Sequence, residues 1–202
     1  MNQTQKQWTR VLGLILLGGA SLSVTAALAG GKGKNDPVNA TARFPVTEGK
    51  NLEGTKFTLP SGFAGKRNLV FVAFQRQQQD DVDTWVPLAK EMALQDSDLR
   101  FYEVPTLSKM NGMIRSFIDG GMKSGIPDKS TREITITVYI DKTPFRKALA
   151  IPDEKQIHAL IVTQDGSILW RSSGKLNREK EEDLRRFIRS TLIEERMANK
   201  AK

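Results

Sequence analysis

Polar and charged side chains follow an apolar run at residues 68–74, and they are the part of this sequence best suited to recognition chemistry. The segment Gln75 to Gln79 supplies amides and the guanidinium of Arg76, groups that can hydrogen-bond the backbone of a partner segment. Carboxylates follow within the next four residues. Because ligands tend to bind at the carboxyl ends of the strands in α/β sheets, we predict a binding surface at this junction.

The carboxylates Asp80, Asp81 and Asp83 fit a helix start better than a metal site. Acidic side chains cap helix N-termini and complement the helix dipole, and the segment lacks the glycine and the distal glutamate of an EF-hand. The amide-rich turn before them is equally consistent with a binding surface and with a solvated loop. Trp85, on the expected helix, fits a core or rim aromatic better than a ligand-stacking platform.

The chain has a single histidine, His158, and no cysteine. A Ser-His-Asp site or a multi-histidine metal site would have to be built around His158 alone, so a structural or surface role is favoured for it. The lack of cysteine excludes thiol–disulfide exchange, structural disulfides and thiolate metal sites. No nucleophile, base and orienting group occur together, so we expect no enzymatic activity, no metal and no cofactor. The candidate binding residues are Gln75, Arg76, Gln78, Asp81, Trp85 and His158.

The first 29 residues have the pattern of a secretory signal peptide. Lys6 and Arg10 form a positive region, and the uncharged apolar stretch after them ends in Ala27-Leu28-Ala29, the small-x-small pattern of a signal-peptidase site. An uncleaved anchor is the alternative, because the apolar stretch approaches membrane thickness, but its glycines, serines and Ala-x-Ala end favour cleavage. No cysteine follows it, which excludes a lipoprotein anchor. We expect an exported protein of the periplasm or an equivalent space, with no stable membrane span after cleavage.

The net charge of +8 does not indicate a nucleic-acid partner. Removal of Lys6 and Arg10 with the signal peptide lowers it to +6. The remaining basic residues alternate with acids, as in residues 178–183, instead of forming one basic stripe. An unidentified protein is therefore the expected partner, and nucleic acid is not.

Composition and periodicity divide the chain into a signal peptide at 1–29, a flexible linker at 30–43, one domain at 44–195 and a frayed tail at 196–202. Strands are expected at 56–59, 68–74, 99–104, 131–141, 158–163 and 167–172, the last two joined by an Asp-Gly hairpin turn. Helices are expected from Val82 onward and at 110–122, 143–150 and 178–197.

Proline, glycine and methionine residues give further expectations for these helices. Pro87 is expected within the first turns of its helix, where a missing N–H costs least, and Gly120-Gly121 is expected to end the next helix. Met110, Met113 and Met122 fit a helix–sheet interface better than an adaptable groove for an apolar client.

The alternation of strands and helices predicts an α/β fold, with a central mixed sheet between two layers of helices. Together with the late Asp-Gly hairpin and the closing helix, it resembles the thioredoxin-like three-layer sandwich. The segment from Phe57 to Phe74 resembles the entry of the exported and peroxiredoxin-type branch. Redox thioredoxins carry Cys-x-x-Cys where this chain has Gln75 to Asp83. They also keep a cis-proline at the strand that begins here at His158, whereas Pro152 lies six residues upstream.

A more specific resemblance is to the ATP-ten family of mitochondrial ATP-synthase assembly factors and their bacterial relatives, over roughly residues 50–190. It rests on an apolar strand leading into a helix that carries Trp85, on the tract Phe145-Arg146-Lys147-Ala148-Leu149, and on the hairpin at 159–174. The resemblance implies a redox-inactive binding or assembly role, chaperone-like in character. A small-ligand-binding domain, or a non-thiol enzyme that uses the same face, remains the alternative.

Overall fold

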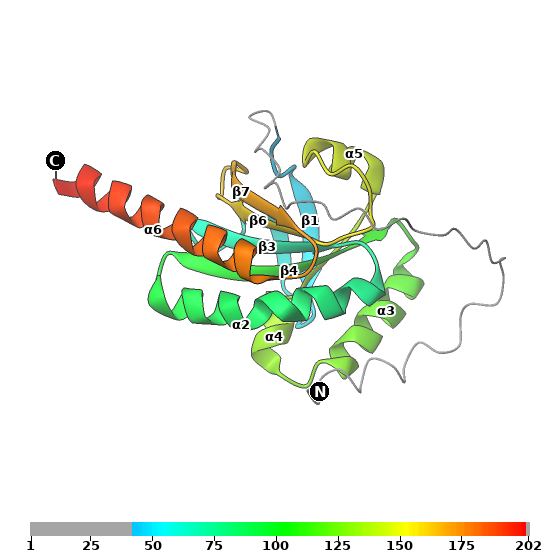
Figure 1. Ribbon diagram of the computed structural model, residues 1–202. Helices are drawn as coiled ribbons and strands as arrows, with labels where there is room; N and C mark the ends of the chain where they lie inside the picture. Colours follow the sequence, from blue (N-terminus) through cyan, green and yellow to red (C-terminus); the bar gives the residue numbers. More distant parts are fainter. Residues whose placement is uncertain (1–41, 201–202) are drawn as a thin grey trace, which may run out of the picture.

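The computed structural model describes residues 42–200; the expected signal peptide and most of the expected linker lie outside them. In chain order the elements are β1 (Thr47–Asn51), β2 (Lys56–Leu59), β3 (Arg67–Ala73), the 3-10 turn η1 (Arg76–Gln78), α2 (Gln79–Gln95), β4 (Leu99–Ser108), α3 (Gly112–Gly125), α4 (Lys129–Ile134), β5 (Ile136–Ile140), α5 (Lys142–Ala148), β6 (His158–Val162), β7 (Ile168–Ser173) and α6 (Arg178–Lys200). Their arrangement is shown in Figure 1.

The described strands form one mixed sheet in the order β2-β1-β5-β4-β3-β6-β7. The strands β3, β4 and β5 are parallel to one another. On one side of them β6 is antiparallel to β3, and β7 is antiparallel to β6. On the other side β1 is antiparallel to β5, and β2 is antiparallel to β1. Parallel neighbours need a crossover, and α2 supplies the one between β3 and β4. The carboxyl ends of β3 and β4 therefore meet at one edge of the sheet.

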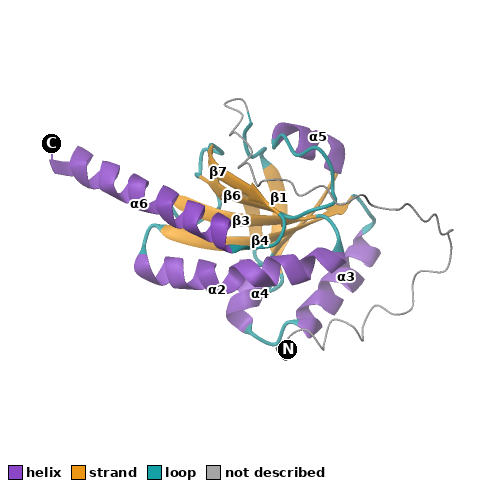
Figure 2. Cartoon of the chain, in the orientation of Figure 1, coloured by secondary structure: helices purple, strands orange, loops and turns teal. Residues whose placement is uncertain are grey.

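Helices cover both faces of the sheet (Figure 2). Val70 and Val72 of β3 point into the core cluster that contains Phe145 of α5, whereas Leu69 and Phe71 point into the cluster that contains residues of α2 and α6. Both faces of β3 are thus buried, which explains its continuous apolar sequence. The predicted α/β three-layer architecture is confirmed.

Two parts of the sheet differ from the sequence prediction. The strand β1 was not predicted, because Thr47–Asn51 contains charged and glycine residues and gives no apolar alternation. The predicted strand at 131–141 is shorter than expected, since α4 takes its first residues. Asp128 accepts hydrogen bonds from the backbone N–H groups of Ser130 and Thr131, and this N-cap starts a helix in a β-branched stretch.

The start of α2 also differs from expectation. The helix begins at Gln79, and its N-cap residue Gln78 makes no side-chain capping bond, so the aspartates are not caps. Asp80 and Asp81 lie in the first turn, where negative charge is still favourable. Pro87 lies in the helix interior and not in its first turns. Its missing N–H leaves the carbonyl four residues earlier, that of Asp83, without the usual helical partner.

The helix α3 runs through Gly120-Gly121 instead of ending there, and it stops at Gly125. An added Cβ at Gly120 would meet open space, so this position is an exposed part of the helix surface. The prediction that the methionines fill a helix–sheet interface is wrong for Met113, which is exposed. Met122 is buried, in a small cluster with Leu52.

The strand β4 extends four residues beyond its expected end at Val104, whereas the closing hairpin follows the prediction. The hairpin of β6 and β7 turns at Asp165-Gly166, where Gly166 has a φ of 89°. Among the described residues the cis peptide bond is Leu59–Pro60, and the residue before β6 is Ile157. Ala42 and Arg43, expected in the linker, pack on the domain, and α6 continues to Lys200.

The helices described between residues 42 and 200 include none that is long and apolar enough to cross a bilayer.

Candidate functional site

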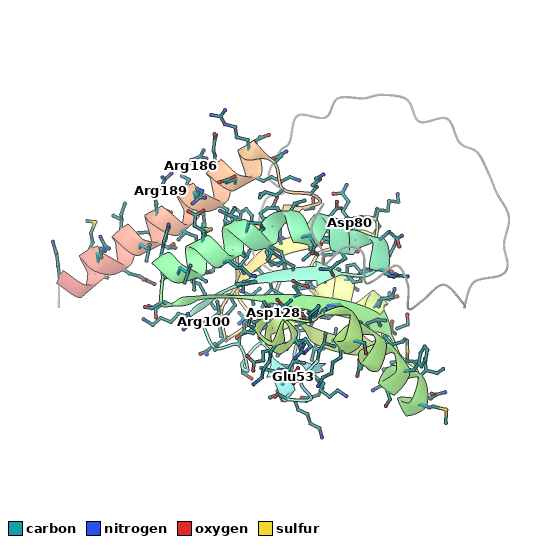
Figure 3. The ribbon with its side chains drawn as sticks, turned by 90° about the horizontal axis from the view of Figure 1, so that it is seen from below. Glu53, Asp80, Arg100, Asp128, Arg186 and Arg189 are labelled. Atoms are coloured by element: carbon teal, nitrogen blue, oxygen red, sulfur yellow. The ribbon has the colours of Figure 1, made fainter. Side chains whose placement is uncertain are left out.

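A cavity of about 650 Å³ opens where β3 and β4 end, between the start of α2 and the helix α3. Its polar lining consists of Gln75, Arg76, Gln77, Gln79, Asp80, Asp83, Thr106, Thr135 and Glu103. Its apolar lining consists of Ala73, Phe74, Pro105, Leu107, Ile118, Met122 and Ile126. Figure 3 shows Asp80 at the end of α2 that borders this cavity. The predicted junction is thus a concave surface and not a flat loop.

Gln78 holds the polar turn in place. Its side chain is only 3% exposed, and its Oε1 accepts hydrogen bonds from the backbone N–H groups of Phe74 (2.8 Å) and Gln75 (3.2 Å). Its Nε2 donates to the carbonyl of Glu154 (2.7 Å), which also accepts from Gln75 Nε2 at 3.0 Å. The turn is therefore attached to the loop before β6. Gln78, predicted as a binding residue, uses its polar atoms within the fold.

Gln75, Arg76 and Gln77 are exposed and line the cavity. Gln77 donates a hydrogen bond from Nε2 to Gln75 Oε1, which holds the two amides together. These side chains are the part of the predicted surface that a partner or ligand can reach. Two of them, Gln75 and Arg76, were predicted from the sequence.

Three side chains form a hydrogen-bonded group on the inner wall of the cavity. Gln79 Nε2 donates to Asp83 Oδ1 at 3.0 Å and to Glu103 Oε2 at 3.2 Å, so one amide bridges two carboxyl groups. Glu103 pairs in register with Phe71 of β3, whose side chain packs beneath α2. Glu103 therefore faces α2, the same side as Asp83.

Burial changes the acidity of both carboxyl groups. Glu103 is 4% exposed, and removal from water raises its pKa to about 7, with the nearby Asp83 adding to the rise and Gln79 and Lys90 opposing it. Burial likewise raises the pKa of Asp83. Near neutral pH the cavity thus contains a carboxyl group that exchanges a proton readily, which is a property of functional sites.

The structure separates the other predicted residues from the cavity. Trp85 is fully buried, and its Nε1 donates to the carbonyl of Gly174 at 3.0 Å, so its indole belongs to the core and not to a binding surface. Asp81 does not line the cavity, and its charge acts on Lys180 of the closing helix. His158 is half-buried and shares a face of β6 with Leu160, which packs toward α5. His158 therefore lies on the opposite face of the sheet from Glu103.

Glu103 was not predicted as a site residue. The sequence did carry a signal, because Leu99, Phe101 and Glu103 alternate along one strand and an acid takes the third position of an otherwise apolar face. An acid on the apolar face of the strand expected at 99–104 is costly to bury, and that cost marks it as a candidate site residue.

The helix α3 presents two different faces. Ile118 and Met122 line the cavity, while Met113 and Phe117 point outward and are exposed. The exposed pair is separated by four positions, so the two side chains lie next to each other on one face of the helix. The apolar surface of the cavity is therefore continued on the outer side of the same helix.

Among the described residues no group of three or more histidine, cysteine, aspartate or glutamate side chains could hold a metal ion. The chemistry that the cavity offers is hydrogen bonding by amides and carboxyl groups, proton exchange at Glu103, and apolar contact. With no cysteine in the chain, thiol–disulfide exchange is excluded.

Comparisons with known proteins show the fold. No family model matches the chain, and no curated protein matches it by sequence. Among solved structures, a protein of Aquifex aeolicus VF5 described as a "putative electron transfer protein" is 9% identical, with a TM-score of 0.51 over 74% of this chain and 96% of that one.

Two further solved structures have lower scores. The thioredoxin domain of a thiol-disulfide oxidoreductase from Bacteroides vulgatus is 16% identical, with a TM-score of 0.43 over 73% of this chain and 96% of that one. BsSco, a member of the Sco family of cytochrome c oxidase assembly proteins, is 13% identical, with a TM-score of 0.48 over 76% and 96%. At identities this low none of the three comparisons indicates a shared activity, and the fold is supported by the protein of Aquifex aeolicus VF5, with its TM-score of 0.51. The chain has a thioredoxin-like fold, as its sequence predicted.

Proposed function

We propose that the chain is an exported, redox-inactive thioredoxin-like protein that binds another protein, in an assembly or chaperone-like role. The observation that carries this proposal is the outer face of α3, where Met113 is 85% and Phe117 60% exposed beside the apolar-walled cavity. Large apolar side chains grouped on a surface are stabilised when a partner covers them, and they mark interaction sites.

The partner segment that fits this surface is apolar and has free backbone polar groups. Met113 and Phe117 offer apolar contact, and methionine adapts to partners of different shape. Gln77 is exposed at the cavity entrance, and its amide oxygen, which accepts none of the hydrogen bonds described above, can accept one from the backbone of a partner. The assembly role is supported by the resemblance of residues 50–190 to the ATP-ten factors and by the lack of cysteine.

A pair of variants tests the surface. Met113→Ser with Phe117→Ser removes the apolar side chains of α3 without touching the core. The matched control is Ile193→Ser with Met197→Ser, because these residues are 58% and 68% exposed and also lie four positions apart on a helix, α6. The chain from Gly30 onward, immobilised and exposed to the exported fraction of its source cell, should retain a specific protein in its native and control forms.

The α3 variant should lose at least about tenfold in affinity for that protein, because two exposed apolar anchors each contribute on the order of 1 kcal/mol or more. Equal capture by the native chain and the α3 variant would refute the surface, and loss of capture in the control pair alone would place the interaction on α6. Recovery of no specific protein by the native chain would count against the proposed function itself.

Export is tested separately. If the signal peptide is cleaved after Ala29, the N-terminal residue of the protein isolated from the exported fraction is Gly30, as mass spectrometry of the intact protein would show. Recovery of the chain with Lys6 and Arg10 still attached would instead support the uncleaved anchor.

The second candidate function is the binding of a small ligand, or a non-thiol reaction on one. The cavity of about 650 Å³ favours it, because this volume is in the range of small-molecule sites. It requires occupation of the cavity interior, whereas the first candidate requires the outer face of α3.

A further inference from the structure

The inner end of the cavity holds a carboxyl group with unused hydrogen-bonding capacity. Glu103 is 4% exposed and lines the cavity, yet the only hydrogen bond described for it reaches Oε2, from Gln79. Its Oε1 has no hydrogen-bond partner among the described residues. This oxygen is not one of the fully buried side-chain atoms that lack a partner, so it borders the cavity that Glu103 lines, where a group of a ligand can reach it.

The rest of the lining defines the kind of ligand. Ile118 and Met122 give an apolar wall along α3, which suits a hydrocarbon chain or ring. The ionisable lining groups are the carboxyl groups of Asp80, Asp83 and Glu103 and the guanidinium of Arg76. Three acids against one base make the polar end of the cavity attractive to a cation and unfavourable to an anion.

We propose that this cavity binds an apolar primary ammonium, whose nitrogen donates hydrogen bonds to Glu103 and whose hydrocarbon part lies against Ile118 and Met122. The ammonium is either a free alkyl or arylalkyl amine or the side chain of a lysine in a protein. An ammonium has three donors and no acceptor, which matches an acceptor-only carboxylate site. This inference goes beyond the proposed partner surface, since it concerns the interior of the cavity and not the outer face of α3.

Charges near Glu103 determine how the affinity of the cavity for the ammonium depends on pH. Asp83 and Lys90 of α2 act on Glu103 through their charges. Asp80 of α2 and Arg76 of η1 are the other charged groups of the cavity lining, whereas α3 and Thr135 contribute only uncharged groups to it. An ammonium needs Glu103 ionised, and the pKa of Glu103 is about 7 without ligand. Binding should therefore release a proton, and the affinity should rise about tenfold between pH 6 and pH 8, as the ionised fraction rises from roughly one tenth to nine tenths.

Three probes with one carbon skeleton isolate the charge. 4-Phenylbutylammonium is the cation, 4-phenylbutan-1-ol the neutral form and 4-phenylbutanoate the anion, and the amine stays protonated throughout this pH range. Calorimetry with the chain from Gly30 onward should show the cation binding at least about tenfold more tightly than the alcohol at pH 8, and no binding of the anion. Equal affinities for cation and alcohol would overturn the proposal.

Two substitutions assign the charge to named residues. Glu103→Gln keeps the shape and the acceptor for Gln79, and it should lower the affinity for the cation at least about tenfold, abolish its pH dependence and change alcohol binding less than twofold. Asp83→Asn should weaken binding of the cation less, because Asp83 already accepts a bond from Gln79. Unchanged cation affinity in Glu103→Gln would refute the proposal.

Methyl NMR locates the probe. The methyl signals of Ile118 and Met122 should shift with 4-phenylbutylammonium, while those of Ile193 and Met197, exposed on α6, should not. Shifts confined to α6 would show binding elsewhere and overturn the assignment.

A peptide, acetyl-Leu-Lys-Leu-amide, distinguishes the two sources of the ammonium. If it shifts the same methyl signals and competes with the amine, the site accepts a lysine side chain; if only the amine binds, the ligand is a free amine. Both results support the shared chemistry, and binding of neither overturns it. Because the partner surface is tested by Met113 and Phe117, failure here would leave the proposed protein interaction unaffected.

Discussion

Burial of Glu103 should cost the protein stability at neutral pH, and Glu103→Gln should recover it. The pKa of this carboxyl rises from 4.5 to about 7 on folding, and burial is the main cause. This rise in the pKa corresponds to about 3 kcal/mol of stability lost once both the folded and the unfolded states are ionised. The amide carries no charge and retains an acceptor for Gln79, so it avoids this cost.

The sign follows from proton binding. Between pH 4.5 and about 7 the folded chain keeps the proton on Glu103 while the unfolded chain loses it, so the stability contribution of this group falls as pH rises. Below pH 4.5 both states are protonated and the cost disappears. The native chain and Glu103→Gln should therefore have similar free energies of unfolding at pH 4.5. At pH 8 the variant should be more stable by about 3 kcal/mol.

Urea unfolding at pH values from 4.5 to 8 measures this difference directly, since both proteins should show the same dependence on urea. Glu194→Gln is the matched control, because Glu194 is exposed on α6 and forms no described ion pair or hydrogen bond. The control should follow the native chain at every pH, within about 0.5 kcal/mol.

A stability difference between the native chain and Glu103→Gln that stays constant from pH 4.5 to pH 8 would refute this reasoning. It would mean that Glu103 ionises in the folded chain as easily as in the unfolded one, so that the cavity supplies water or charge that the described residues do not. A variant less stable than the native chain at pH 8 would show that the carboxylate is stabilised in place.

Three further substitutions test the packing around the site and the fold. Gln78→Ala should destabilise the protein by about 3 kcal/mol in urea unfolding, since buried backbone groups lose their partners; an unchanged midpoint would show that Gln78 is not structural. Asp96→Ala should cost about 3 kcal/mol by the same assay, because Arg67 is 3% exposed and loses a 2.9 Å ion pair, keeping only the one with Glu195, while the backbone N–H of Asp98 loses its acceptor. A cost below about 1 kcal/mol would contradict this. Gly166→Ala should lower the melting temperature by several degrees, because φ is 89° and a Cβ would lie 2.8 Å from the carbonyl oxygen of Phe44; an unchanged temperature would show that the turn relaxes.

The sequence predicted the elements whose hydrophobic pattern is complete. The run at 68–74 is apolar on both faces and became β3, and the Asp165-Gly166 turn became a hairpin. Prediction from the sequence failed where tertiary contacts override the local conformational preference. The N-cap of Asp128 made a helix from a β-branched segment, and β1 forms only because β5 and β2 pair with its polar sequence.

The sequence directed attention to the junction after β3, where the structure has a cavity, but of the six candidate binding residues only Gln75 and Arg76 line it. Position along the chain identified the junction after β3, because the end of a buried strand is visible in sequence. The sequence did not indicate in which direction each side chain of the turn points. Gln75 and Arg76 line the cavity, whereas Gln78 turns inward to hold the turn, and Trp85 is in the core. A binding test based on Gln78 would therefore report on folding, and Gln77 is the better choice beside Arg76.

Burial of Glu103 connects the expected loss of stability with the proposed binding of an ammonium. Glu103 makes one described hydrogen bond, which does not offset the free energy that its burial is expected to cost at neutral pH. In a site that binds a cation, the ligand offsets this loss of stability, because its hydrogen bonds replace those that the carboxylate made with water. Glu103→Gln should therefore raise stability at pH 8 and remove binding of the ammonium together. If stability rose while the ammonium bound as before, the acid would have no role in recognition, and the cavity would act through its apolar wall alone.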